Sequence, residues 1–174
     1  MPLYRAPVED FRFLLHEVLA LETHRDLPQF ADLSPELIDD ILSNAGKFHE
    51  EVFQPLNQSG DAEGCRFENG AVTTPKGFKD AYKAYCEAGW GGLGAPESAG
   101  GAGLPPIITM AVSEMGMSSN QSLAMYPMLT AGAYGALFAT GADWMKQNIA
   151  PKLVSGEWAG TMCLTESGCG TDLR

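Results

Sequence analysis

The residues best suited to chemistry lie near the end of the chain, where an apolar run breaks into a glycine-rich turn. The turn combines short hydroxyls, glycines and an acid, namely Thr165, Ser167, Gly168, Gly170, Thr171 and Asp172. Glycine lets a backbone approach a ligand closely, so such a turn directs several N–H groups and hydroxyls toward one point. The pattern is typical of a site for an oxygen- and nitrogen-rich ligand. On composition alone an ordinary loop after a strand is favoured, because Gly and Asp mark most turns.

The residues before this turn predict the secondary structure that holds it in place. From Trp158 the chain mixes Thr and Cys with Met and Leu, which predicts a mostly buried strand. Everything earlier predicts helix. Apolar residues at three- and four-residue spacing predict a helix over 9–21, and Ser34 followed by Pro35 predicts the start of a long helix over 35–56. Thr74 and Pro75 predict the start of a third helix, which Gly89 ends.

Three further helices are predicted over 105–118, 122–139 and 143–153, with surface connections over 57–73 and 89–103. The helices over 105–118 and 122–139 lack a polar face, which predicts that they lie at the centre of a bundle. We therefore predict an all-α domain of about six helices over 1–156. The change of periodicity at Trp158 predicts that 157–174 begin a second domain with its first strand.

Composition excludes several classes of protein. Eleven basic and 22 acidic side chains give a net charge of −11, which disfavours nucleic-acid binding. The four cysteines form no metal or disulfide pattern, and no signal peptide is present, so we expect reduced thiols in a cytoplasmic protein. The uncharged stretch between Glu114 and Asp143 is interrupted by Pro127, Gly132 and Gly135 among others, so we expect no membrane span there.

Two other motifs are weak. Gly89–Gly94 satisfies G-x-G-x-x-G, but a helix precedes it and no helix opens from it, so a rigid loop is favoured over a dinucleotide site. His16, His24 and His49 have no partners at metal-ligand spacing, so we expect surface or core-edge histidines and no metal. The pairs Asp39-Asp40 and Glu50-Glu51 are interpreted as solvated helix faces. No residue is predicted to be catalytic.

Three stretches together resemble the acyl-CoA dehydrogenase family. Met162-Cys163-Leu164-Thr165-Glu166, with Gly168, Gly170, Thr171 and Asp172, resembles its signature, an apolar strand followed by T-E-P-x-A-G-S-D. Glu87–Leu93 with Pro96-Glu97 and Gly100–Leu104 resembles a loop of that family, and Ala150–Trp158 resembles its run into the strand. The opening Met1–Pro7, with Asp10 and Phe13, resembles one branch of the family.

The resemblance implies a helical N-terminal domain, then a β-barrel domain and a C-terminal helical bundle that is absent from these residues. It also implies FAD as cofactor, contacted by Met162, Cys163, Leu164, Thr165, Glu166, Ser167, Gly168, Cys169, Gly170 and Thr171. Thr171 would contact the acyl-CoA as well. Ser167, Cys169 and Thr171 replace the usual proline, alanine and serine, all by small residues.

The implied reaction is α,β-dehydrogenation of an acyl-CoA, with a carboxylate of the C-terminal domain as base and the β-hydride passing to the flavin. No residue here matches that base, so we expect the chain alone to be inactive and to bind FAD weakly or not at all. The segment Met125–Leu129 lines the acyl pocket or is plain core. The implied partners are acyl-CoA, an electron-transfer flavoprotein or similar acceptor, and further copies in a dimer or tetramer.

Two alternatives stay open beside the enzyme. The first is a non-catalytic helical module that keeps the fold for partner binding. The second is a DNA-associated relative of the family, which the net charge of −11 disfavours. Neither nucleic acid nor a membrane is expected as a partner.

Overall fold

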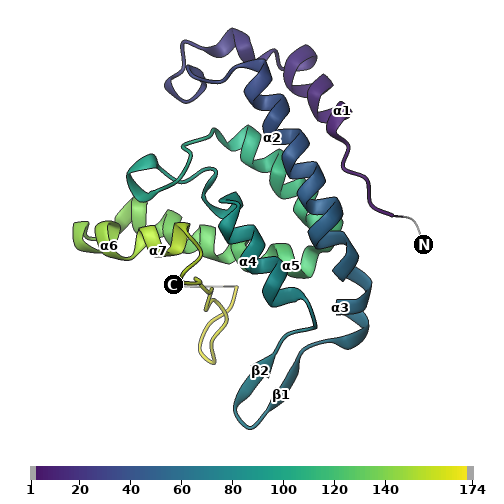
Figure 1. Cartoon of the computed structure of the whole chain (residues 1–174). Coiled ribbons are helices and arrows are strands. Elements are labelled where there is room, and N and C mark those ends of the chain that lie inside the picture. The colour runs from purple at the N-terminus through teal and green to yellow at the C-terminus, as the bar shows by residue number, and fades with distance from the viewer. Residues whose placement is uncertain (1–2, 172–174) are drawn as a thin grey trace.

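A computed structural model describes residues 3–171 as an assembly of helices with one small hairpin (Figure 1). The α-helices are α1 (Val8–Arg12), α2 (Pro35–Phe48), α3 (Asn57–Glu63), α4 (Phe78–Glu87), α5 (Pro106–Thr140), α6 (Asp143–Asn148) and α7 (Ala150–Val154). Single π- and 3₁₀-helical turns join them: η1 (Phe13–Val18), η2 (Leu21–His24), η3 (Pro28–Phe30), η4 (His49–Phe53), η5 (Gln54–Leu56), η6 (Trp90–Gly92) and η7 (Glu97–Ala99). The predicted helical fold class is confirmed.

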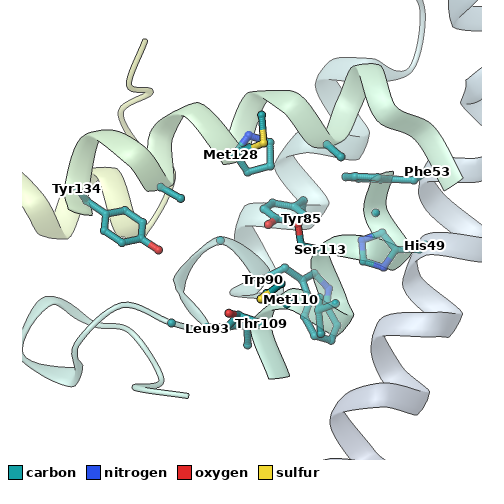
Figure 2. A pocket seen from close by; sticks show the side chains of 17 residues that line it. His49, Phe53, Tyr85, Trp90, Leu93, Thr109, Met110, Ser113, Met128 and Tyr134 are labelled. Carbon is teal, nitrogen blue, oxygen red and sulfur yellow. The ribbon is translucent and has the colours of Figure 1, made fainter. Parts of the chain in front are cut away.

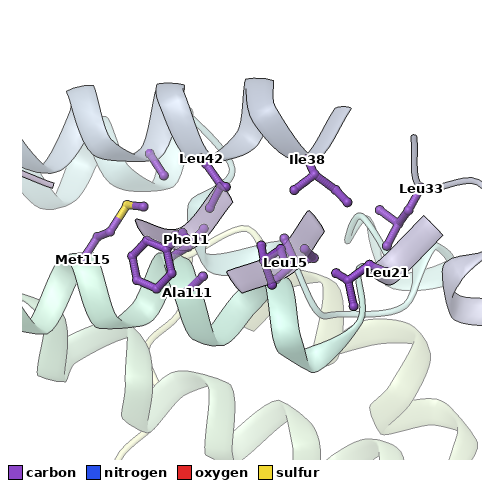
Figure 3. Close-up of a cluster of buried hydrophobic side chains, with 11 residues drawn as sticks. Phe11, Leu15, Leu21, Leu33, Ile38, Leu42, Ala111 and Met115 are labelled. Carbon is purple, nitrogen blue, oxygen red and sulfur yellow. The ribbon is translucent and has the colours of Figure 1, made fainter. Parts of the chain in front are cut away.

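Helix α2 forms where its sequence predicts it. Ser34 Oγ accepts a hydrogen bond from Leu37 N at 3.2 Å, so the predicted cap is present, and Pro35 occupies the first helical position. The apolar stripe of α2 is buried against α1, η1 and the first half of α5, and it makes the main core of the molecule (Figure 3). The helical path continues through η4 and η5 into α3, so the segment from 35 to 63 reaches further than the predicted helix.

Helix α5 bends sharply at Asn120, whose backbone angles (φ −160°, ψ 91°) are not helical. The Asn120 side chain is 1% exposed and holds the bend from both sides. Its Nδ2 donates to Phe53 O at 3.1 Å, and its Oδ1 accepts from Leu123 N at 3.2 Å and from Ser122 Oγ at 2.9 Å. Asn120 therefore caps the second half of α5 and ties it to η4. The predicted division into two helical segments is confirmed.

The predicted burial of these two segments is only half right. The first half of α5 carries fully buried residues such as Ile108 and Met115. In the second half Met125, Tyr126 and Met128 are 43%, 39% and 45% exposed. An apolar surface indicates what a helix is able to bury, but another element must cover it. Among the described residues, no element covers this part of α5 on all sides.

The segment 57–73 is largely exposed, as predicted for a surface connection, but it carries secondary structure that was not predicted. It contains α3 and a hairpin of β1 (Arg66–Glu68) and β2 (Ala71–Thr73), antiparallel with Phe67 opposite Val72. Asn69 and Gly70 form its turn with φ of 52° and 78°. An Asn-Gly pair is the strongest local signal for such a turn. The hairpin projects from the body of the molecule and its strands are exposed (Figure 1).

Helix α4 does not begin at Thr74 and Pro75 as predicted. It begins at Phe78, and the residue before it, Gly77, adopts φ of 87°. A side chain at 77 would collide with Leu56, so the close approach of η5 selects glycine there. Lys76 N donates to Glu63 Oε2 at 3.0 Å, which ties this entry to the end of α3.

The predicted strand from Trp158 is not formed within the described residues. Residues 159–165 make no β-ladder, and a single bridge joins Glu166 to Cys169. Met162 is 65% exposed. A strand needs a neighbouring strand to satisfy its backbone groups, and none lies beside this segment in residues 3–171. The predicted domain boundary near residue 156 stays a prediction. None of the described helices combines the length and apolar character that a membrane span requires.

Candidate functional site

The structure contains a cavity of about 260 Å³ between α4, η4, η6 and both halves of α5 (Figure 2). Its wall is largely aromatic and apolar, formed by Phe53, Tyr85, Trp90, Met110, Pro127, Met128 and Tyr134 among others. The bend at Asn120 creates this space, because it turns the second half of α5 back across α4. The composition of the wall suits an aliphatic ligand, since ligand cavities are mainly apolar with a few placed polar groups.

Aromatic contacts fix the shape of this cavity. The rings of Phe53 and Tyr85 stack with centroids 5.7 Å apart, and Phe48 meets Phe53 edge to face at 5.5 Å. Phe48 also contacts Trp90 at 5.9 Å. Such pairs stabilise a packed arrangement beyond the area that they bury. Burial raises the pKa of the Tyr85 phenol above its usual range, so this group is neutral at physiological pH.

One polar group of the wall, His49, is deeply buried. The side chain is 1% exposed, and its Nδ1 lies 2.8 Å from Ala45 O. Because a carbonyl only accepts, Nδ1 carries the proton and Nε2 is an acceptor in the neutral ring. Burial lowers the pKa of this imidazole, which favours the neutral form. The expectation of a surface or core-edge histidine is therefore wrong for His49.

The residues of the segment Met125–Leu129 border different parts of the structure, because they point in different directions from the helix. Pro127 and Met128 line the cavity, whereas Met125 borders a shallow hollow beside α3. The backbone carbonyl of Leu129 lies near Gly160 in the last part of the chain, and Leu129 does not line the cavity. Consecutive helical residues point in directions about 100° apart, so no single wall is able to include all five.

The segment leading to the glycine-rich turn is anchored on α5 and α7. Trp158 N donates to Lys152 O at 3.0 Å, and Lys152 Nζ lies 4.4 Å from the centroid of the Trp158 ring. Gly160 N donates to Thr130 Oγ1 at 3.1 Å, and a Cβ on Gly160 would overlap Ala133. The chain thus passes so close to α5 at residue 160 that only glycine fits.

The turn itself, which holds the predicted FAD contacts 162–171, is closed by a pair of backbone hydrogen bonds. Glu166 N donates to Cys169 O at 2.8 Å, and Cys169 N donates to Glu166 O at 3.3 Å. Residues 161–168 are exposed, and a Cβ on Gly168 would meet open space. The hydroxyls of Thr165, Ser167 and Thr171 have no hydrogen-bond partner within residues 3–171. This donor set fits a heteroatom-rich group such as a flavin.

The two candidate regions lie on different faces of α5. Pro127, Ala131 and Tyr134, spaced by four and three residues, line the cavity, whereas Thr130 and Ala133 face the segment at Gly160. The described residues therefore do not bring the turn and the cavity together into one site. Asp172 lies outside the described residues.

The G-x-G-x-x-G stretch forms the crowded loop that was predicted. Gly92 O accepts hydrogen bonds from Ala95 N and Ala102 N at 3.1 and 3.0 Å, and a Cβ on Gly101 would overlap Ala95 O. A 3₁₀ turn, η6, opens from the first glycine, whereas the dinucleotide fingerprint needs an α-helix there to receive the pyrophosphate. The described residues also contain no cluster of His, Cys, Asp or Glu able to hold a metal ion.

The carboxylates interpreted as solvation have structural partners. Asp39 Oδ1 accepts from Arg12 Nε at 3.0 Å and lies 3.1 Å from His16 Nε2, which joins η1 to α2. Glu50 pairs with Arg5 at 2.9 Å and accepts from Ala6 N at 2.8 Å. These pairs fasten the N-terminal segment to the helical body, and none of their members lines the cavity.

Fold and site together define a helical domain that offers an aromatic cavity and an exposed glycine-rich turn. A comparison with known protein families assigns this helical domain to one of them. The profile described as "Acyl-CoA dehydrogenase, N-terminal domain" matches residues 36–157. The chain belongs to the acyl-CoA dehydrogenase family.

Relatives are similar over almost the whole chain. A 3-methylmercaptopropionyl-CoA dehydrogenase of Ruegeria pomeroyi, the branch that the opening residues resemble, is 38% identical over 98% of this chain and 29% of its own length. A butyryl-CoA dehydrogenase of Syntrophomonas wolfei is 34% identical over 98% of this chain and 28% of its own length. A broad-specificity linear acyl-CoA dehydrogenase of Mycobacterium tuberculosis is 29% identical over the same shares. The chain thus spans somewhat more than a quarter of these relatives' length.

Proposed function

We propose that this chain forms the N-terminal part of an FAD-dependent enzyme that dehydrogenates a short acyl-CoA thioester between its α- and β-carbons. The observation that carries the proposal is the family match over 36–157 together with an aromatic cavity in the same residues. Relatives named for butyryl and 3-methylmercaptopropionyl thioesters support a short acyl group. A cavity of about 260 Å³ is ample for such a group.

The two regions have separate roles in this proposal. The turn over 162–171 holds FAD through its backbone N–H groups and the hydroxyls of Thr165 and Thr171, and Thr171 also contacts the acyl-CoA. Bound FAD supplies the acceptor for the substrate's β-hydride. Pro127 and Met128 of the cavity form one wall of the acyl site and keep water away from the acyl chain of the substrate. The base that removes the α-proton lies outside these residues, as do most flavin contacts.

The remaining parts of the proposal concern partners. An electron-transfer flavoprotein or similar acceptor takes the electrons, and the complete enzyme is a dimer or tetramer. The family relation and the short span of the relatives' length that the chain covers support treating 157–174 as the start of a second domain.

The test uses two proteins, the 174-residue chain and a protein in which the chain continues into a flavin-binding remainder. We expect the longer protein to bind one FAD and to reduce an electron-accepting dye when butyryl-CoA is added. The 174-residue chain should do neither. Stoichiometric flavin and dye reduction by the short chain would overturn the assignment of the base. A longer protein without flavin would instead favour a non-catalytic helical module.

A further inference from the structure

His49 lines the cavity, and its acceptor nitrogen Nε2 is the feature that no hydrogen bond within residues 3–171 uses. Nδ1 is engaged with Ala45 O at 2.8 Å, whereas Nε2 has no hydrogen-bond partner among residues 3–171. The ring itself is held by edge-to-face contacts with Phe48 at 5.5 Å and Phe53 at 5.2 Å. Its position is thus fixed by packing, and its tautomer by the Ala45 carbonyl. Nε2 is therefore an acceptor that a donor entering the cavity is able to reach.

Gly116 keeps the space in front of this nitrogen free. A Cβ at position 116 would lie 3.2 Å from His49 Nε2, and both residues line the cavity. Glycine in the middle of a helix is intrinsically unfavourable by about 1 kcal/mol relative to alanine. The fold tolerates that cost at a position of α5 where a methyl group would cover the acceptor.

A buried polar group without a partner lies on the same wall. Trp90 Nε1 is buried and has no hydrogen-bond partner within the described part of the chain. The Trp90 and His49 rings are 6.5 Å apart between centroids, and Figure 2 shows both at the edge of the cavity. One is a donor and the other an acceptor, which is the pair of functions that a hydroxyl group matches.

We propose that the cavity binds a short aliphatic chain that carries a hydroxyl group, and that His49 Nε2 accepts the hydrogen bond from this hydroxyl. The rest of the wall, with Phe53, Met110 and Met128, contacts the carbon chain. This inference rests on the proposed function only in that the bound aliphatic chain would be the tail of the acyl group. It adds a polar subsite that selects donor-bearing tails over purely apolar ones.

The experiment compares two isomeric probes, butan-1-ol and 1-methoxypropane, which have the same atoms but differ in that only the alcohol donates a hydrogen bond. Binding to the 174-residue chain is followed by NMR, through the ¹⁵N resonance of His49 Nε2 and the resonances of the cavity methyl groups. We expect the alcohol to bind about five-fold more tightly, as one net hydrogen bond implies, and to shift the Nε2 resonance. The ether should move the methyl resonances only.

Three variants distinguish the contribution of the acceptor nitrogen from that of the rest of the cavity wall. Gly116→Ala covers Nε2 and His49→Phe removes it, so both should reduce the preference for the alcohol to about one-fold while the ether still binds. Ser113→Ala, which alters another hydroxyl on the wall, should keep the preference. Equal binding of the two probes to the unmodified chain, an unshifted Nε2 resonance, or loss of the preference in Ser113→Ala would each overturn the proposal.

The outcome is independent of catalysis. The spectrum of the unmodified chain decides the question even if His49→Phe does not fold. No flavin is needed, so failure of alcohol binding leaves the dehydrogenase proposal standing, and failure of dehydrogenation leaves the subsite standing.

Discussion

Asn120 gives the sharpest test of how the cavity is built. Its side chain makes three hydrogen bonds at the bend of α5, to Phe53 O at 3.1 Å, from Leu123 N at 3.2 Å and from Ser122 Oγ at 2.9 Å. With 1% exposure it has little water to replace them. Asn120→Ala removes all three bonds and leaves the Phe53 carbonyl without its side-chain donor.

The expected cost follows from these contacts. Loss of a helix cap costs about 1 kcal/mol. Loss of a buried hydrogen bond with its acceptor left unpaired costs about 1–3 kcal/mol. We expect the free energy of unfolding of Asn120→Ala to fall by about 3 kcal/mol. With a urea dependence of about 2 kcal/mol per molar, the unfolding midpoint should move down by about 1.5 M.

The assay is equilibrium urea unfolding followed by far-ultraviolet circular dichroism, with two matched variants. Asn120→Ser keeps an oxygen that caps Leu123 N but loses the bond to Phe53 O, so it should lose about half as much stability. Ser122→Ala removes one of the three hydrogen bonds, from an exposed residue, and leaves both the cap of Leu123 N and the bond to Phe53 O, so it should change stability by less than about 0.5 kcal/mol. If Asn120→Ala is as stable as the unmodified chain, or no less stable than Asn120→Ser, packing alone holds the bend and the reasoning is refuted.

Three further predictions concern single positions. Because burial lowers the pKa of His49, the folded state takes up fewer protons than the unfolded one, so stability should fall as pH drops below about 6.5, by at most about 1.4 kcal/mol per pH unit. When urea unfolding is measured from pH 5 to 8, the free energy of unfolding should depend less on pH in His49→Gln than in the unmodified chain. Equal pH dependence in the two proteins would contradict this prediction. Gly160→Ala should push the last segment away from Ala133, seen as faster amide exchange at 158–165, and unchanged exchange would disprove the contact. Gly101→Ala should lower stability by about 1–3 kcal/mol in urea unfolding because its methyl meets Ala95 O, and a neutral effect would show that the loop yields.

Local patterns in the sequence predict the helices well. Ser34 before Pro35 starts α2 by satisfying a free N–H group, and this depends only on neighbouring residues. The Asn69-Gly70 turn was equally local, but the three-residue strands beside it are too short to show a period of two. Gly77 could not be recognised as the residue before α4, because the collision that selects it comes from Leu56.

The candidate site was likewise predictable from the sequence only where it depends on neighbouring residues. The chemistry of 162–171 was predictable, because hydroxyls and glycines act through their own types and spacing. Whether these residues contact FAD stays a prediction. The cavity was missed apart from Pro127 and Met128, because its wall joins residues from four separate elements. His49 was assigned to the surface or core edge since its burial depends on α5 and η6 closing over it.

The sequence by itself determined the helical class, the cap of α2, the interruption of α5 and the family to which the chain belongs. Each of these follows from residue types within a few turns of one another or from ordered motifs along the chain. The tertiary structure alone decided which apolar face is covered, that Asn120 reaches Phe53, and that His49 presents a free acceptor to a cavity. The physical reason is that burial and hydrogen-bond satisfaction depend on what packs opposite, which periodicity along one helix does not specify.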